Sequence, residues 1–218
     1  MEQIPAPARE RLLSLMRLLE HSTEKTLSSS QIETITGWSS HTIRKDISCL
    51  NDDVSISSSS GYEKNTLLPV IKKALGLDKK RKFCIVGLGR LGSAYLGLGS
   101  PVIPGEMPQN TVQSGAEPDG FELAAGFDTN VNRIEILPSS VPLYPAYKMG
   151  EVIGRFGIEM ALLCVPAASA QAAAEKLAAA GIRGIVNFAP AELHLPPEIA
   201  VRNVYVTDDL RALAIKMN

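Results

Sequence analysis

The sequence predicts a helical N-terminal domain with helix-turn-helix spacing, followed by an α/β domain with a doubly wound parallel sheet. Two observations predict this. Before residue 80 the apolar residues recur at helical spacing, and after it short apolar runs alternate with helical segments. The 218 residues suffice for one large domain or two ordinary ones. We therefore expect domains over residues 1–80 and 81–206, with a last helix over 207–218.

The first domain begins with three short helical patterns. Residues 9–20 place apolar side chains on one helical stripe. Ser28 to Ser30 supply N-cap oxygens for a second helix that carries Ile32 and Ile35 and stops at Gly37. Ser39 and Ser40 cap a third helix, whose buried side should carry Ile43, Ile47 and Leu50. The short link containing Gly37 is typical of a helix-turn-helix.

A fourth helix is expected over 66–75, with Pro69 in its first turn and Gly76 after its end. The residues before it, 51–60, should form a loop.

The third helix is the candidate for DNA recognition. With Ile43 and Ile47 facing inward, the polar side chains of its first turns point outward, where such a helix meets the major groove. Arginine suits guanine edges and lysine suits phosphates. The candidate residues are Ser40, His41, Thr42, Arg44 and Lys45. A solvated basic face is the alternative.

The second domain should alternate strands and helices. The apolar run 83–86 is typical of a central parallel strand covered on both faces. Further strands are expected at 121–127, 160–165, 184–188 and 203–206, and helices at 168–180 and 208–217. The Pro- and Gly-rich stretch 97–120 should be a long loop.

A glycine motif follows the first of these strands. The run Gly87-Leu88-Gly89-Arg90-Leu91-Gly92 has the G-x-G-x-x-G spacing in the strand-to-helix context that makes it informative. Its glycines permit a tight turn, approach of the backbone to a pyrophosphate, and close packing of helix on strand. Arg90 could add a contact to phosphate. A glycine-rich turn without a ligand is the alternative.

Asp128 ends the next strand and is the candidate for a ribose hydroxyl. An acid at this position favours NAD over NADP, because it would repel a 2′-phosphate. An aspartate serving only a turn is the alternative.

Taken together, these segments resemble the Rex family of bacterial redox-sensing transcriptional repressors. The resemblance extends over most of the chain and rests on the glycine motif and on runs such as Ile43–Ser48, Phe127-Asp128, Val165-Pro166, Gly181–Pro190 and Ala200–Val204. It implies a winged helix, a Rossmann domain that binds NAD(H), and a C-terminal helix exchanged within a homodimer. It also implies binding to double-stranded operator DNA, with NADH binding releasing that DNA.

The resemblance assigns roles to further residues. The glycine run would hold the pyrophosphate and Asp128 the adenosine ribose. Val165, Pro166, Asn187, Phe188 and Ala189 would flank the nicotinamide half of the cofactor. Gly61 and Tyr62, with the loop before them, would join the recognition helix on DNA, and Arg17 would link the DNA-binding domain to the cofactor domains.

The chain departs from the family at the wing and at the switch residues. The wing segment 51–60 carries two aspartates and a run of four serines in place of glycines and a basic residue. Leu98 stands where the family has a tyrosine, and Tyr205 and Val206 stand where it has an acid and a bulky apolar residue.

Composition excludes several classes of protein. The net charge is −1, and no apolar run reaches the about 20 residues that span a bilayer. The three cysteines, Cys49, Cys84 and Cys164, lack the spacing of a metal site or a disulfide scaffold. We expect a cytoplasmic protein with no metal and no membrane partner.

Two other functions remain open. A small NAD-dependent dehydrogenase is disfavoured, because the second half of the sheet uses the residues after Asp128 and leaves no substrate domain. The second domain also resembles the CoA-binding domains of acyl-CoA ligases, although the helix-turn-helix argues against that function.

Overall fold

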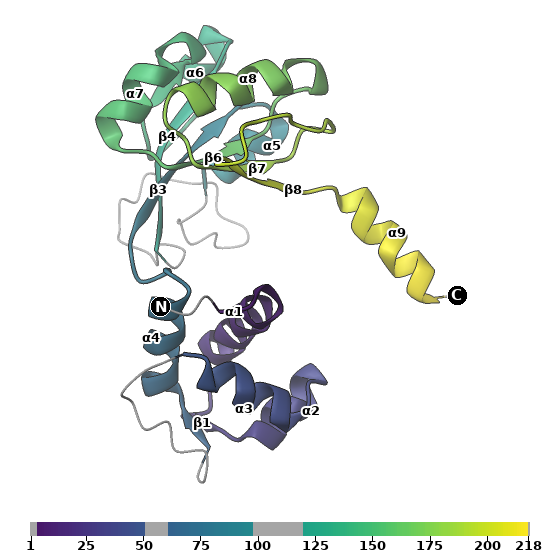
Figure 1. The fold of residues 1–218 in the computed structure, drawn as a ribbon. Coiled ribbons are helices and arrows are strands. Elements are labelled where there is room, and N and C mark those ends of the chain that lie inside the picture. Colours follow the sequence, from purple (N-terminus) through teal and green to yellow (C-terminus); the bar gives the residue numbers. More distant parts are fainter. Residues whose placement is uncertain (1–3, 51–60, 98–119, 218) are drawn as a thin grey trace. The chain divides into compact units, whose positions relative to one another are not determined.

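The computed structural model describes residues 4–50, 61–97 and 120–217. The chain divides into two compact units, residues 1–79 and 80–218 (Figure 1). The wing segment 51–60, Leu98 and most of the loop expected at 97–120 lie outside the described residues.

The first unit is a helical domain with one short β-ladder. Its helices are α1 (Ala6–His21), α2 (Ser29–Thr36), α3 (Ser40–Ser48) and α4 (Lys64–Ala74). Strand β1 (Thr26–Leu27) pairs antiparallel with β2 (Tyr62–Glu63), so the ladder brackets α2 and α3 in the chain. Its core is formed by one apolar face of each helix, including Leu12, Leu19, Ile32, Ile43, Ile47, Leu67 and Ile71.

The helix boundaries follow local capping signals. The Ser28 hydroxyl accepts from the Gln31 amide while the Gln31 side chain accepts from the Ser28 amide, which is a complete capping box. Gly37 ends α2 in the left-handed conformation, with φ at 75°. Ser39 caps α3 by accepting from the amide of Thr42. The predicted helix-turn-helix is therefore fixed at both of its junctions.

The start predicted for the fourth helix was wrong. Helix α4 begins at Lys64 rather than Thr66, so Pro69 lies inside the helix instead of in its first turn. The helix continues through the proline because Leu67, Val70 and Ile71 are buried in the core on either side of it. On α2, Ile32 is fully buried, whereas Ile35 is 58% exposed.

The second unit is a six-stranded parallel sheet in the order β5-β4-β3-β6-β7-β8. This is the doubly wound order in which the chain starts centrally, runs to one edge, and returns to fill the other half. The strands are β3 (Arg81–Val86), β4 (Phe121–Asp128), β5 (Leu143–Pro145), β6 (Met160–Leu163), β7 (Gly184–Asn187) and β8 (Ala200–Asn203). The helices are α5 (Arg90–Tyr95), α6 (Val131–Ile136), α7 (Met149–Phe156), α8 (Ala167–Ala179) and α9 (Val206–Met217), with a 3-10 turn, η1 (Ala146–Lys148).

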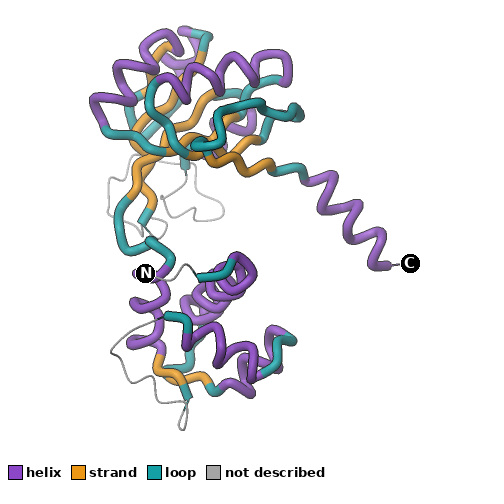
Figure 2. Tube along the Cα trace, in the orientation of Figure 1, coloured by secondary structure: helices purple, strands orange, loops and turns teal. Residues whose placement is uncertain are grey.

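Figure 2 draws the strands of this sheet in orange, with helices α7 and α8 along one face, and clusters of buried apolar side chains lie on both faces. Strand β3 divides its side chains between two clusters. Cys84 and Val86 pack with α7 and α8, whereas Phe83 and Ile85 pack with Leu88 and Leu96. Alternate residues of a strand point to opposite faces, so this division is what a central strand requires.

Parts of this unit differ from the expectation. Strand β5, helix α6, the 3-10 turn and helix α7 were not predicted. The strand expected at 203–206 lies instead at 200–203, because its pairing with β7 sets Gly184 opposite Ala200 and Asn187 opposite Asn203. Val206 is the first residue of α9. Among the described residues, no helix has the length and apolar character needed to cross a membrane.

Helix α9 differs from every other long helix of this unit in its exposure. Within the described residues, none of its side chains is buried. Its large apolar side chains are exposed to solvent: Val206, Leu210, Leu213, Ile215 and Met217.

Candidate functional site

The glycine motif forms a tight turn at the carboxyl end of β3. Gly87 has φ at 91°, and a Cβ on it would lie 2.7 Å from the carbonyl oxygen of Cys164. A Cβ on Gly92 would lie 1.9 Å from the carbonyl oxygen of Gly87. Both positions therefore require glycine for packing inside the protein itself.

Gly89 is different. A Cβ placed on it would meet no atom of the described residues within 4 Å. Its φ of −68° is one that any residue adopts. Neither packing nor backbone conformation among the described residues requires a glycine at this position, and the open space beside it, which we call the cradle, leaves the backbone accessible.

Asp128 lies at the end of β4, beside this turn. It is 5% exposed, and its Oδ2 accepts from the amide of Leu88 at 2.7 Å. The Arg133 guanidinium donates to the same oxygen at 2.9 Å, and the Asn130 amide donates to Oδ1 at 2.8 Å. Burial acts to raise the pKa of Asp128, but these donors outweigh it, and the pKa lies below the usual value. The carboxylate is therefore ionised near neutral pH and helps to hold the glycine turn.

The predicted nicotinamide-side residues come from the ends of two other strands. Val165 packs on the glycine turn, since its Cγ1 would lie 2.8 Å from a Cβ on Gly87. Pro166 is the N-cap of α8. Phe188, which follows β7, packs its ring against that of Tyr95 from α5, with centroids 5.2 Å apart. In parallel sheets, ligands bind at the carboxyl ends of the strands where the strand order reverses, here between β3 and β6.

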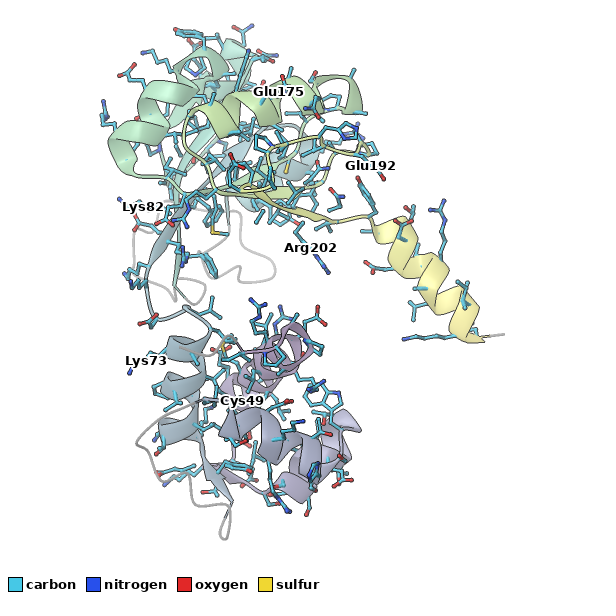
Figure 3. The ribbon with its side chains drawn as sticks, in the orientation of Figure 1. Cys49, Lys73, Lys82, Glu175, Glu192 and Arg202 are labelled. Atoms are coloured by element: carbon cyan, nitrogen blue, oxygen red, sulfur yellow. The ribbon has the colours of Figure 1, made fainter. Side chains whose placement is uncertain are left out.

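Asn187 and Ala189 are buried rather than open to a ligand. The Asn187 side chain accepts from the Ala189 amide at 3.0 Å and donates to the Ala191 carbonyl at 2.8 Å. It also donates to the Asn203 side chain at 3.0 Å. These bonds fix the shape of the loop after β7, where Figure 3 labels Glu192.

The two thiols of this unit, Cys84 and Cys164, are protonated at neutral pH. Burial raises the pKa of Cys84 to about 12 and that of Cys164 to about 11. No group of three or more His, Cys, Asp or Glu side chains in the described ranges could hold a metal ion.

The outer face of α3 carries the predicted DNA-binding side chains. His41, Arg44, Lys45 and Ser48 line an open depression. The Nε of Arg44 lies 3.4 Å from the hydroxyl of Ser29 on α2. The hydroxyls of Ser40 and Thr42 bond to Glu33 and Ser39, so they serve the start of the helix.

A partly buried ion pair fixes this helix to α1. Arg11 donates to both carboxylate oxygens of Asp46, at 2.6 and 2.8 Å. This two-point contact between Arg11 and Asp46 restrains the rotation of α3 about its axis. Arg17, on the same helix α1, is exposed.

Tyr62 is buried, unlike the exposed side chains on the outer face of α3, and Gly61 beside it lies in a tight turn. The Tyr62 side chain is 2% exposed and belongs to the core, so its ring is not open to a ligand. Gly61 has φ at 96°, and a Cβ there would lie 2.9 Å from the Thr26 side chain.

The Tyr205 hydroxyl, at one of the positions where the sequence departs from the family, donates to the Ala191 carbonyl at 3.0 Å. Two residues at this edge of the sheet were missed in the sequence: Tyr95 faces Phe188, and Arg133 pairs with Asp128. Only Arg133 gave a local signal, a cation five residues after the candidate aspartate.

Comparison with known proteins matches both units. A family model described as "Putative DNA-binding protein N-terminus" matches residues 3–48, and one described as "CoA binding domain" matches residues 110–191. The redox-sensing transcriptional repressor Rex of Thermus thermophilus is 34% identical, with 93% of this chain and 88% of that protein aligned. The chain belongs to the Rex family.

Further Rex proteins agree with this assignment. The redox-sensing transcriptional repressor Rex 1 of Enterococcus faecalis is 31% identical over 91% of this chain and 84% of its own length. Among solved structures, RSP, a Rex-family repressor, matches with a TM-score of 0.79 and 28% identity over 100% of this chain and 96% of that chain. RSP in complex with β-NAD⁺ and operator DNA matches with a TM-score of 0.82 and 28% identity over 99% and 93%.

Proposed function

We propose that this protein is a transcriptional repressor that senses the NADH/NAD⁺ ratio, binds operator DNA through its first unit, and releases that DNA when NADH binds to the second. The observation that carries this proposal is the match to Rex repressors along both units. RSP has been solved with β-NADH and with β-NAD⁺ plus operator DNA, which are the two ligand states that such a switch needs.

The cofactor site is proposed at the glycine turn. The run Gly87–Gly92 would hold the pyrophosphate, with Gly89 giving the close approach and the exposed Arg90 adding a charge-assisted contact. Asp128 would face the adenosine ribose, and its ionised state disfavours a 2′-phosphate. The cofactor supplies a nicotinamide ring whose charge differs between its oxidised and reduced forms.

The nicotinamide half would lie toward the ends of β6 and β7. Val165, Pro166 and Phe188 offer surface there, while Asn187 and Ala189 hold the loop in shape from within. Because Cys84 and Cys164 remain protonated at neutral pH, we assign the redox response to the cofactor and not to these thiols.

The DNA contact is proposed on α3, with Arg44 at base edges and Lys45 at phosphates. His41, Thr42 and Ser40 would lie beside them at the helix start, and the backbone of Gly61 and Tyr62 would approach the adjoining phosphates. Arg17 on α1 is the residue proposed to link the DNA-binding domain to the cofactor-binding domains of the dimer.

A homodimer would give the repressor its two half-site contacts. Helix α9 is the proposed exchanged element, because a second copy of this chain would cover its exposed apolar side chains. We accordingly divide the chain into a DNA-binding domain over 1–80, an NAD(H)-binding domain over 81–206 and the exchanged segment 207–218. The protein would act in the cytoplasm, without catalysis, metal or membrane contact.

An operator titration tests this function. Binding to a palindromic operator is followed by fluorescence anisotropy at one fixed salt concentration, with NAD⁺, NADH or CoA added separately. Release by NADH and not by NAD⁺ or CoA is the expected result. Operator binding that is insensitive to NADH would contradict the switch, and release by CoA alone would favour a CoA-responsive protein built on the same domain.

A further inference from the structure

The start of α9 is tied to the loop after β7 by a network of four residues, Asn187, Ala191, Asn203 and Tyr205. Two donors meet on the carbonyl oxygen of Ala191: the Asn187 side chain at 2.8 Å and the Tyr205 hydroxyl at 3.0 Å. The Asn187 side chain also reaches Asn203 at 3.0 Å, and the Val204 amide donates to the Asn187 carbonyl at 2.9 Å. The loop and the segment that leads into α9 therefore share hydrogen-bond partners.

The same loop borders the proposed cofactor site. Asn187, the last residue of β7, is fully buried, and its side chain accepts a hydrogen bond from the Ala189 amide. This bond fixes the beginning of the loop, next to the carboxyl edge of the sheet. Between these two residues, Phe188 packs against Tyr95, from the helix that follows the glycine turn. A change in what occupies the sheet edge would thus act on the segment that ends at Ala191.

Beyond its first turn, α9 is held weakly by its own unit. The Asp208 amide donates to the Tyr205 carbonyl at 2.9 Å, so Tyr205 belongs to the start of the helix. Among the described residues, no side chain of α9 is buried. The contacts at its start therefore set the direction in which α9 leaves the sheet.

We propose that Tyr205 is a positioning residue that couples the cofactor site to α9, because its hydroxyl ties the helix to the loop that ends at Ala191. This inference rests on the proposed function, in which that loop flanks the nicotinamide half and α9 packs against a second copy of the chain. Loss of the hydroxyl should weaken the effect of the cofactor on DNA binding without changing how tightly the cofactor binds.

Tyr205→Phe is a minimal test of this role. It removes one donor and keeps the ring, which is half-buried. The Ala191 carbonyl keeps its bond from Asn187, so the loop retains a partner. Tyr147→Phe is the matched control, since Tyr147 belongs to the same unit and is 81% exposed.

The measured quantity is the ratio of operator Kd with saturating NADH to that with saturating NAD⁺. We expect Tyr147→Phe to keep the wild-type ratio and Tyr205→Phe to lower it by about threefold or more, within the range of ordinary allosteric coupling. NADH affinity, measured by calorimetry, should stay within about twofold, because no proposed cofactor contact is removed. An unchanged ratio for Tyr205→Phe would overturn this inference alone, whereas a wild-type ratio of one would overturn the proposed function and this inference with it.

Hydrogen exchange on the wild-type protein gives a second test that needs no variant. Amides in residues 203–211 should exchange at different rates with NAD⁺ and with NADH bound, because the hydrogen bonds at the start of α9 would change. Identical rates in the two states would overturn the inference even if Tyr205→Phe failed to fold.

Discussion

At the carboxyl edge of the sheet, the polar side chains are already engaged by the protein: Asp128 accepts three hydrogen bonds, and Asn187 is satisfied by the loop and by Asn203. On the outer face of α3, by contrast, His41, Arg44 and Lys45 are exposed. Substitutions at the edge should therefore change folding and cofactor binding together, whereas substitutions on α3 should change DNA binding alone. Gly89 is the exception at the edge, because the described protein makes no use of its missing side chain.

The largest effect is expected for Gly92→Ala. The new Cβ would lie 1.9 Å from the Gly87 carbonyl oxygen, so the turn must open. We expect a loss of about 3 kcal/mol in the stability of the second unit, at the upper end of overpacking effects. Thermal unfolding measures it, with Gly150→Ala as the control. Gly150 lies in α7, and a Cβ there would meet nothing within 4 Å among the described residues. A stable Gly92→Ala protein would show that the turn is not as tightly packed as described.

Gly89→Ala should separate binding from folding. Its φ suits alanine, and its Cβ would enter the proposed cradle instead of the protein. We expect unchanged thermal stability and a loss of NADH affinity of about tenfold or more, which corresponds to about 1.4 kcal/mol. Calorimetry with NADH measures the affinity. If Gly89→Ala bound NADH as the wild type does, the pyrophosphate would not lie at this glycine.

On α3, Arg44→Ala and Lys45→Ala should have different effects on DNA binding. Loss of a base-edge contact by Arg44 should cost about 1–3 kcal/mol of operator-binding free energy and relax the preference for the operator sequence. Loss of a phosphate contact by Lys45 should weaken binding to all sequences and reduce, by about 1, the slope of the logarithm of the binding constant against the logarithm of the salt concentration. Titrations of operator and scrambled DNA at several salt concentrations distinguish these outcomes. Lys176→Ala, an exposed site on α8, is the control. Equal losses on both DNAs for Arg44→Ala would assign that side chain to the backbone.

The smallest effect concerns acid stability. Because the folded-state pKa of Asp128 is lowered, the stabilisation from its ionised form is present above the unfolded-state value of about 3.9 and is lost as pH falls through the folded-state pKa. Asp128→Asn should therefore lower the stability of the second unit near neutral pH and flatten its decline below about pH 4. The free energy of unfolding, measured with denaturant at a series of pH values, checks this. If that free energy declined below about pH 4 in the variant as it does in the wild type, other carboxylates would dominate the acid dependence.

Local signals predicted the parts of the fold that local interactions fix. The caps at Ser28 and Ser39, the left-handed Gly37 and the glycine turn each depend on neighbouring residues, and the structure has all of them. The strand expected at 203–206 was misplaced because a Val-Tyr-Val run has high strand propensity, while the actual register depends on pairing with β7. Helix α7 was missed because its eight residues give too short a periodic pattern between loops.

For the candidate site, the sequence likewise predicted what a local motif fixes and missed contacts between distant segments. The positions of Gly87–Gly92 and Asp128 at adjacent strand ends follow from the motif and from the parallel topology. The pairing of Tyr95 with Phe188, and of Tyr205 with Ala191, joins segments that only the folded sheet brings together. Burial of Tyr62 likewise depends on the β1–β2 ladder, which pairs Tyr62 with Leu27.

The most direct test of the account is NADH-driven release of a preformed operator complex, compared between the wild type and Gly89→Ala. Both proteins should bind the operator equally without cofactor, because α3 is unchanged. The account predicts that NADH releases the DNA from the wild type and that the variant needs about tenfold or more NADH for the same release. Equal release from both proteins, or from neither, would contradict it.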